Sequence, residues 1–281
     1  MESRIWIVGC GDIGLRIAQR LQREGEEPTG VVRSPQSAER LRAAGIAAHR
    51  CDLDHETPPA NGTVLWLAPP PREGRTDPRI ARFVAARPSV ARMIYLSTSG
   101  VYGDCDGAWI DEDAPMRPKT ARAERRVDAE RVLAAWVDDA GIDLRVLRVP
   151  GIYGPGRLPE ARLRAGTPTI APAQSPFTNR IHADDLAAAA LAVLARGRAG
   201  RAYNIADGNP TTMADYFQRC ARLLGLPEPP ALPPEEARAG MSAAMWSFME
   251  ESKRLRVDRL RDEIGFRWQY PDLESGLRSC L

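Results

Sequence analysis

The stretch from Ile5 to Gly14, IWIVGCGDIG, decides the fold of this chain of 281 residues. Four consecutive apolar residues at 5–8 are typical of a strand that is buried on both faces of a parallel sheet. The glycines that follow match the pattern G-x-G-x-x-G, and residues 12–23 continue with apolar side chains at helical spacing. A strand, this glycine loop and a helix, in that order, predict a site for the pyrophosphate of a dinucleotide.

Each glycine of the loop has its own expected role. Gly9 permits a tight turn, Gly11 lets the backbone approach the pyrophosphate, and Gly14 lets the helix pack on the strand. Asp12 and Ile13 open the helix, so their backbone N–H groups are expected to face the phosphates. The alternative is an ordinary glycine-rich turn between a strand and a helix, with no ligand.

The rest of the chain alternates strands with helices, which predicts an α/β fold with a doubly wound parallel sheet of the Rossmann type. Residues 1–150, joined by 181–210, are expected to form the dinucleotide-binding domain. Residues 151–180 and 211–281 interrupt the alternation and are assigned to a small substrate-binding lobe. We expect further strands at 29–32, 46–49, 63–68, 93–97, 142–149 and 202–206, and helices at 37–44, 77–87, 122–140 and 183–194.

Composition narrows the class of protein. A formal net charge of +2 gives no reason to expect nucleic acid or a membrane surface as partner. The longest apolar stretch, 186–195, is half the length that a bilayer requires. Five cysteines without a C-x-x-C pair predict neither a disulfide framework nor a metal site, and they favour the reducing cytoplasm.

The end of the second strand predicts which dinucleotide binds. An acidic residue that would hold the ribose 2′-hydroxyl of NAD is missing there, and Arg33 and Ser34 suit a 2′-phosphate instead. NADP is therefore preferred over NAD, although Arg33 could also be an ordinary surface arginine. The other cofactor residues expected at strand ends are Asp52 and Leu53 near the adenine, and Ala68 and Pro69 beside the ribose.

Four short motifs between residues 97 and 206 occur together, and their order along the chain is informative. They are STSGVYG at 97–103, IYGPG at 152–156, RIHADD at 180–185 and YNIA at 203–206. Together they resemble the extended short-chain dehydrogenase/reductase superfamily, of the NAD-dependent epimerase/dehydratase type. SKR at 252–254 is similar to atypical members, which are described only as NAD(P)-binding oxidoreductase-like proteins. The resemblance implies that Ser97 and Ile152 line the cofactor site.

The resemblance does not extend to the family's catalytic pair, a tyrosine and a lysine spaced Y-x-x-x-K. Thr98 matches the serine or threonine that accompanies the pair, but Arg122 stands at the tyrosine position and Arg126 at the lysine position. None of the six tyrosines is followed by lysine four residues later. Because arginine does not deprotonate, it cannot replace the acid. Arg126 is expected to hold the cofactor ribose as the lysine would.

Other residues are candidates for the missing roles. Tyr102 and Tyr153 follow strands and are predicted as displaced proton donors, with simple packing as the alternative. Thr98 would polarise a substrate carbonyl. Three cations are candidates for the substrate site. If they line the lobe, they predict a carboxylate or phosphate on the substrate. The alternative is that they are ordinary exposed charges. These cations are Arg122, Arg180 and Lys253.

Three functions remain open on these residues. The first is an NADP-dependent reductase or dehydrogenase for a small, anionic carbonyl or alcohol substrate, with water, Tyr102 or Tyr153 as the proton donor. The second is a nucleotide-sugar epimerase or dehydratase, and the third is a non-catalytic NAD(P)-binding regulator. A homodimer through helix 122–140 is also left open, since its apolar positions equally suit packing on the sheet.

Overall fold

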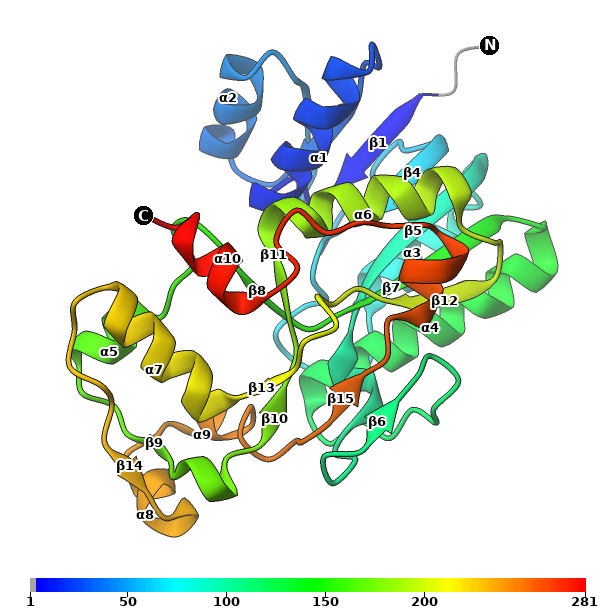
Figure 1. Ribbon diagram of the computed structural model, residues 1–281. Coiled ribbons are helices and arrows are strands. Elements are labelled where there is room, and N and C mark those ends of the chain that lie inside the picture. Colours follow the sequence, from blue (N-terminus) through cyan, green and yellow to red (C-terminus); the bar gives the residue numbers. More distant parts are fainter. Residues whose placement is uncertain (1–3) are drawn as a thin grey trace.

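The computed structural model describes residues 4–281, and a parallel sheet of seven strands is its centre (Figure 1). The strand order is β3-β2-β1-β4-β5-β7-β12, so the chain leaves β1 in one direction and returns on its other side at β4. The strands are β1 (Ile5–Val8), β2 (Thr29–Val32), β3 (Ala47–Arg50), β4 (Gly62–Trp66), β5 (Val90–Thr98), β7 (Asp143–Val149) and β12 (Arg201–Asn204). The predicted doubly wound parallel sheet is confirmed.

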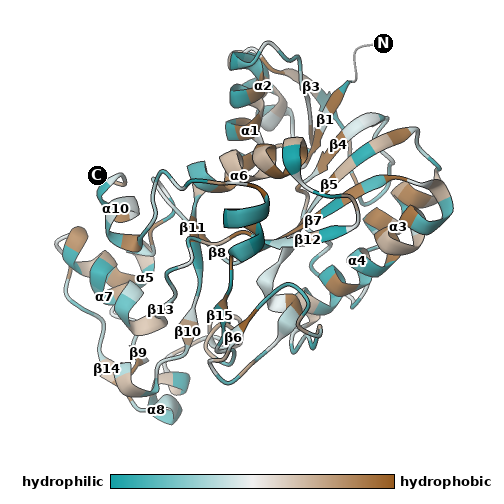
Figure 2. Ribbon diagram, turned by 45° about the vertical axis from the view of Figure 1, so that its right-hand side comes forward, coloured by the Kyte–Doolittle hydropathy of each residue, from teal (hydrophilic) through white to brown (hydrophobic). Residues whose placement is uncertain are grey.

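Helices cover both faces of the sheet, and the residues of β1 alternate between two cores. Ile5 and Ile7 pack toward α1, α2 and α6, whereas Trp6 and Val8 pack toward α3 and α4. This double burial explains why β1 is apolar throughout and β4 nearly so, whereas the hydrophilic bands on β7 in Figure 2 include its arginines. The helices are α1 (Asp12–Arg23), α2 (Pro35–Ala43), α3 (Pro78–Ala85), α4 (Ala121–Ala140) and α6 (Ala183–Arg196).

A smaller lobe lies below the carboxyl ends of the strands in Figure 1 and is built from short paired segments. Its strands pair as β8 (Gly151–Tyr153) with β11 (Arg180–His182), β9 (Thr169–Ile170) with β14 (Ala231–Leu232), and β10 (Phe177–Thr178) with β13 (Thr211–Thr212). Its helices are α5 (Glu160–Arg164), α7 (Met213–Leu223), α8 (Pro234–Ala239), α9 (Ala243–Trp246) and α10 (Leu273–Arg278). They share a separate apolar core that includes Tyr153, Phe217 and Leu277.

The last part of the chain returns from the lobe to the sheet. Strand β15 (Arg254–Leu255) pairs with β6 (Trp109–Ile110), and the turn η3 (Arg259–Glu263) follows it. Leu260 and Phe266 lie in the same core as α1 and α6, so this segment packs with the sheet although it falls in the range assigned to the lobe. The division into a dinucleotide-binding domain and a substrate-binding lobe stays a prediction. Residues 1–3, assigned to the first of these, lie outside the described residues.

Within residues 4–281, no helix is both long enough and apolar enough to cross a bilayer.

Candidate functional site

The glycine loop after β1 has the geometry that its sequence predicts. Gly9 has a φ of +83°, and a Cβ built on it would lie 2.4 Å from the backbone nitrogen of Ala68. A Cβ on Gly14 would meet a methyl group of Ile7 at 3.1 Å, so this glycine lets α1 pack on β1. A Cβ on Gly11 would meet nothing within 4 Å. Gly11 therefore faces open space, as a residue beside a pyrophosphate should.

The start of α1 is open as well. The first N–H groups of a helix have no partner within it, and no side chain caps α1 at Gly11. Asp12, the first residue of the helix, forms ion pairs with Arg157 at 2.8 Å and with Arg16 at 3.2 Å. Burial opposes ionisation of Asp12, but these two arginines outweigh it and lower the pKa of the carboxyl group.

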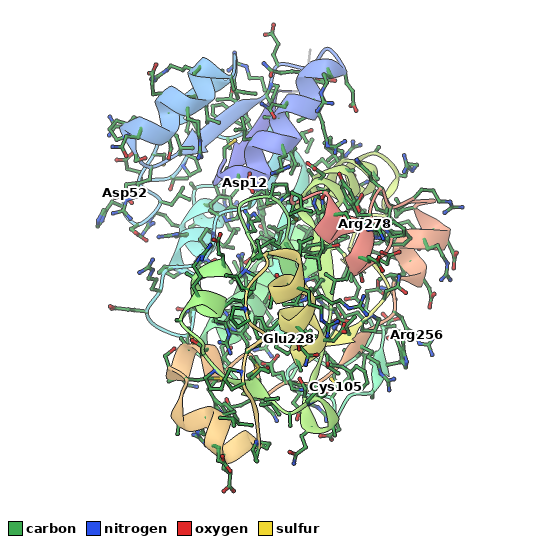
Figure 3. The ribbon with its side chains drawn as sticks, turned by 60° about the vertical axis from the view of Figure 1, so that its left-hand side comes forward. Asp12, Asp52, Cys105, Glu228, Arg256 and Arg278 are labelled. Atoms are coloured by element: carbon green, nitrogen blue, oxygen red, sulfur yellow. The ribbon has the colours of Figure 1, made fainter. Side chains whose placement is uncertain are left out.

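A pocket of about 140 Å³ lies beside Gly9, at the carboxyl ends of β2, β3 and β4. It brings together six residues that the sequence assigns to the cofactor: Gly9, Arg33, Asp52, Leu53, Ala68 and Pro69. Figure 3 shows Asp52 on the outer edge of this half of the molecule and Asp12 at the end of α1 that faces the lobe. The pocket thus borders the glycine loop at Gly9, at the point where the strand order reverses.

Two arginines of this pocket differ in how firmly they are held. The side chain of Arg33 is 71% exposed, and its nearest carboxylate oxygens, on Asp52 and Asp54, are 3.7 Å away. Arg79 is held by Asp54 at 2.7 Å and donates to the Pro69 carbonyl at 2.7 Å. Arg79 is not among the residues predicted to bind the cofactor, because its place in the sequence indicates only the first turn of a helix.

Ser34 has a role within the protein, because its hydroxyl oxygen accepts a hydrogen bond from the Ser37 N–H at 3.1 Å and caps α2. Ile152 lies in β8, half-buried and paired in register with Ile181. Neither side chain lines the pocket beside Gly9.

The carboxyl end of β5 lies beside the start of α4. Thr98 is half-buried, and its hydroxyl oxygen accepts a hydrogen bond from the Gly100 N–H at 3.2 Å. Arg126 of α4 donates to the Tyr95 hydroxyl at 3.0 Å and reaches the Ala68 carbonyl at 3.4 Å. It therefore lies over the ends of β4 and β5, at the position predicted for contact with the cofactor ribose.

The three predicted substrate cations differ in their surroundings. Arg122 is exposed, and its guanidinium lies 4.1 Å from the centre of the Phe248 ring. Lys253 is buried and donates to the Gly103 carbonyl and the Glu251 carboxylate, both at 2.6 Å. We correct its assignment accordingly: its charge is committed to holding the segment around it against the loop after β5.

Arg180 is buried in the lobe, where its guanidinium stacks 3.4 Å from the centre of the Tyr216 ring. Within residues 4–281, its Nε has no hydrogen-bond partner. Burial raises the pKa of neighbouring Asp207 to about 7, and the charge of Arg180 works in the opposite direction.

The structure does not favour Tyr102 or Tyr153 as proton donors. The Tyr102 hydroxyl is buried, donates to Asn204 at 2.8 Å and accepts from Arg148 at 3.1 Å. Tyr153 is fully buried and reaches the Asp272 carbonyl at 3.4 Å. Burial raises the pKa of Tyr102 to about 12 and raises that of Tyr153 further. The alternative interpretation, packing with a hydrogen bond, describes both residues.

A buried polar network lies near the carboxyl ends of β5 and β7. Arg148 of β7 pairs with Glu130 of α4 at 2.8 Å, with both side chains less than a tenth exposed. The Ser97 hydroxyl donates to the same carboxylate, and Arg148 also donates to the Glu112 carbonyl at 2.9 Å. Ser97 thus serves this network, which joins β5, α4 and β7 beneath Thr98.

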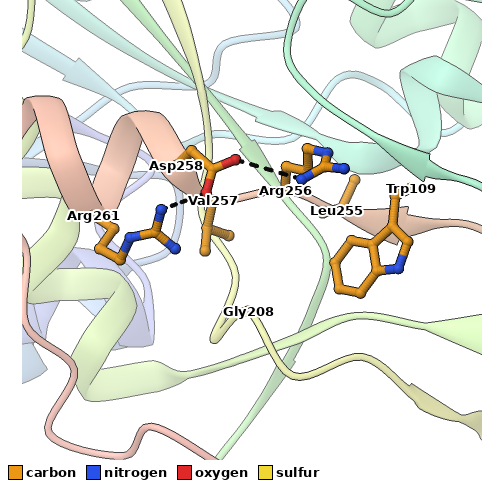
Figure 4. Close-up of a pocket in the computed structure, with 7 residues that line it drawn as sticks. All are labelled: Trp109, Gly208, Leu255, Arg256, Val257, Asp258 and Arg261. Atoms are coloured by element: carbon orange, nitrogen blue, oxygen red, sulfur yellow. Dashed lines mark hydrogen bonds and ion pairs between the residues drawn. The ribbon is translucent and has the colours of Figure 1, made fainter.

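A second pocket, of about 260 Å³, lies between Gly208 and the segment that contains β15 (Figure 4). Asp258 pairs with Arg261 at 2.6 Å and lies 3.9 Å from Arg256. Asp262 also pairs with Arg261, at 2.7 Å, so two carboxylates balance the two arginines. We assign this pocket no role. Within residues 4–281, no cluster of histidine, cysteine and acidic residues could hold a metal ion.

Comparison with known proteins agrees with this geometry. Residues 79–206 match the NAD dependent epimerase/dehydratase family, and residues 5–64 match ketopantoate reductase PanE/ApbA. Protein YeeZ of Escherichia coli (strain K12) is 30% identical over 96% of this chain and 97% of its own. A dTDP-glucose 4,6-dehydratase of Streptomyces niveus is 30% identical over 50% of this chain and 44% of its own.

A solved structure carries the likeness along the whole chain. A conserved protein of unknown function from Silicibacter pomeroyi DSS superposes with a TM-score of 0.84 and 33% identity, covering 99% of this chain and 98% of its own. The shared fold therefore extends over both the parallel sheet and the lobe. The chain belongs to the NAD-dependent epimerase/dehydratase family.

Proposed function

We propose that this protein is an NADP-dependent oxidoreductase that acts on a small carbonyl or alcohol substrate with an anionic group. The observation that carries the cofactor half of the proposal is Arg33. It follows β2, is mostly exposed, and borders the pocket beside Gly9, where an NAD site would have an acidic side chain. Its planar guanidinium suits a 2′-phosphate.

The residues present fit a bound dinucleotide. Gly11 and the uncapped start of α1 would hold the pyrophosphate, and Asp52 and Leu53 would flank the adenine. Arg126 would contact the ribose beside β4. The nicotinamide, when bound, exchanges a hydride with the substrate.

Titration with NADPH and NADH tests the cofactor half. Arg33→Ala is expected to weaken NADPH binding about tenfold and to leave NADH binding unchanged, because only NADPH carries the 2′-phosphate. Nicotinamide fluorescence measures both affinities. Arg42→Ala is the control, since it removes an exposed arginine of α2 that pairs loosely with Glu39. Equal loss of NADPH and NADH affinity in Arg33→Ala would contradict the proposal.

The substrate half depends on Thr98 and Arg122, at the end of β5 and the start of α4. The Thr98 hydroxyl accepts one bond from Gly100 and keeps its own proton to donate to a carbonyl oxygen. Arg122 makes its described contact with the Phe248 ring and leaves its N–H groups for a carboxylate or phosphate. Since both candidate phenols are buried, water supplies the proton.

A panel of small carbonyl compounds, with and without a carboxylate or phosphate, tests the substrate half by NADPH oxidation. Arg122→Ala is expected to raise KM for the anionic substrates about tenfold or more, because a bidentate contact is lost. Cofactor affinity should stay unchanged. Arg131→Ala, an exposed arginine of the same helix, is the matched control. Turnover restricted to uncharged carbonyls would contradict the role of Arg122.

A nucleotide-sugar epimerase or dehydratase is the second candidate, favoured by the buried guanidinium of Arg180 and its unpartnered Nε among residues 4–281. The dTDP-glucose dehydratase relative points the same way. Against it stands the exposed Arg122 at the family's tyrosine position, since these reactions also need that acid. Incubation with dTDP-glucose or UDP-glucose, followed by chromatography of the nucleotide sugar, decides between the two functions.

A further inference from the structure

Two parts of the chain that are far apart in sequence meet at the glycine loop. Asp12 opens α1, and Arg157 lies in the loop that follows β8, on the lobe side. The Nε of Arg157 donates to a carboxylate oxygen of Asp12 at 2.8 Å. The side chains are only partly exposed, Arg157 at 32% and Asp12 at 43%. This pair is therefore a bridge at the mouth of the site that the proposed function assigns to the dinucleotide.

Asp12 is an unusual residue for that place. The open space over Gly11 and the uncapped N–H groups of α1 suit a pyrophosphate, which carries two negative charges. A carboxylate one residue further on repels those charges unless a cation neutralises it. Arg16 supplies part of this neutralisation, but it also binds the Asp184 carboxylate at the start of α6. Arg157 is the cation that approaches Asp12 from the lobe.

The geometry of Arg157 leaves it able to bind a second anion. Its Nε is taken by Asp12, whereas its Nη1 and Nη2 donate to no group within residues 4–281. A guanidinium presents five N–H donors in one plane, so one edge can hold a carboxylate while another holds a phosphate.

The backbone that carries Arg157 is also fixed. A Cβ built on Gly154 would lie 3.2 Å from the His182 ring, and the Arg157 N–H donates to the Gly154 carbonyl at 3.0 Å. The turn therefore brings Arg157 beside α1, where its side chain reaches Asp12.

We propose that Arg157 is a phosphate-binding residue of the dinucleotide site, which contacts the pyrophosphate from the lobe side while Asp12 orients it. This inference rests on the proposed function, because it requires that a dinucleotide binds along the glycine loop. It adds a contact from outside the Rossmann half of the chain. The lobe thereby takes part in holding the cofactor as well as the substrate.

Calorimetric titration of Arg157→Ala, Asp12→Asn and the double variant tests the proposal with three ligands. NADPH and ADP-ribose contain the pyrophosphate, and adenosine 2′-monophosphate lacks it. Arg157→Ala is expected to weaken the first two about tenfold to a hundredfold, the range for a lost charge-assisted hydrogen bond, and to leave the third unchanged. Asp12→Asn in the Arg157→Ala background should recover part of the loss, because it removes the uncompensated carboxylate.

Controls separate this role from others. Arg164→Ala removes an arginine of α5 that pairs with Glu160 at 2.7 Å, and it should change no affinity. Thermal melting of the ligand-free variants should differ little, because partly exposed ion pairs contribute little stability. Unchanged or tighter NADPH binding by Arg157→Ala would overturn the proposal, as would a double variant no better than Arg157→Ala. If the wild-type protein binds no dinucleotide, the proposed function fails as well.

Discussion

The substitution Gly9→Ala is expected to lower the free energy of unfolding by at least about 3 kcal/mol and to abolish dinucleotide binding. The backbone of Gly9 has a φ of +83°, and the added Cβ would lie 2.4 Å from a backbone atom of Ala68. A clash with a backbone atom cannot be relieved by rotation, as a clash with the end of a flexible side chain can. The ends of β1 and β4 would have to separate, and these two strands flank the point where the strand order reverses.

Gly11→Ala is the matched comparison, because its added Cβ meets no protein atom within 4 Å. The variant should unfold at the wild-type denaturant concentration yet bind NADPH at least about tenfold more weakly, because the methyl group occupies the space of the pyrophosphate. Chemical denaturation and cofactor titration of both variants separate folding from binding. Undiminished NADPH binding by Gly11→Ala would place the pyrophosphate elsewhere.

Removal of the Glu130 charge is expected to destabilise the protein by about 3–5 kcal/mol, the usual cost of leaving the partner of a buried ion pair alone. Glu130→Gln keeps the shape of the side chain but leaves the Arg148 guanidinium with no carboxylate at 2.8 Å. The Ser97 hydroxyl would also lose its charged acceptor. Because Ser97 precedes Thr98, the end of β5 should become less ordered.

Urea denaturation measures this effect, with Asp138→Asn as the control on an exposed position of the same helix. The control should change stability by less than about 0.5 kcal/mol. An equally small change in Glu130→Gln would mean that Arg148 finds compensation in its bonds to Tyr102 and the Glu112 carbonyl.

The first strand–helix–strand unit of the fold follows from local sequence. The observed bounds of β1, α1 and β2 are those that hydrophobic periodicity predicts, because these elements are buried on regular faces. The roles of Gly9 and Gly14 also follow, since a glycine between a strand and a helix has few alternatives. Residues at the ends of β2, β3 and β4 meet in one pocket because parallel strands end at the same edge.

Side-chain direction at the strand ends does not follow from the sequence. Tyr102 and Tyr153 come after strands, as proton donors would, but their partners Asn204 and Asp272 are more than a hundred residues further along the chain. Lys253 pairs with the Gly103 carbonyl across a similar separation. The two-residue strands of the lobe exist only through such long-range pairing, so a local pattern carries no signal for them.

The return of the chain to the sheet after the lobe has a consequence for assembly. Strand β12 is an edge of the seven-stranded sheet, and an unguarded edge is a template for strands of other chains. Here Arg259 of η3 donates to the Ala202 carbonyl at 3.3 Å, and Glu263 pairs with Arg201 at 3.0 Å. The protein's own C-terminal segment therefore covers part of this border and opposes extension of the sheet by a strand of another chain.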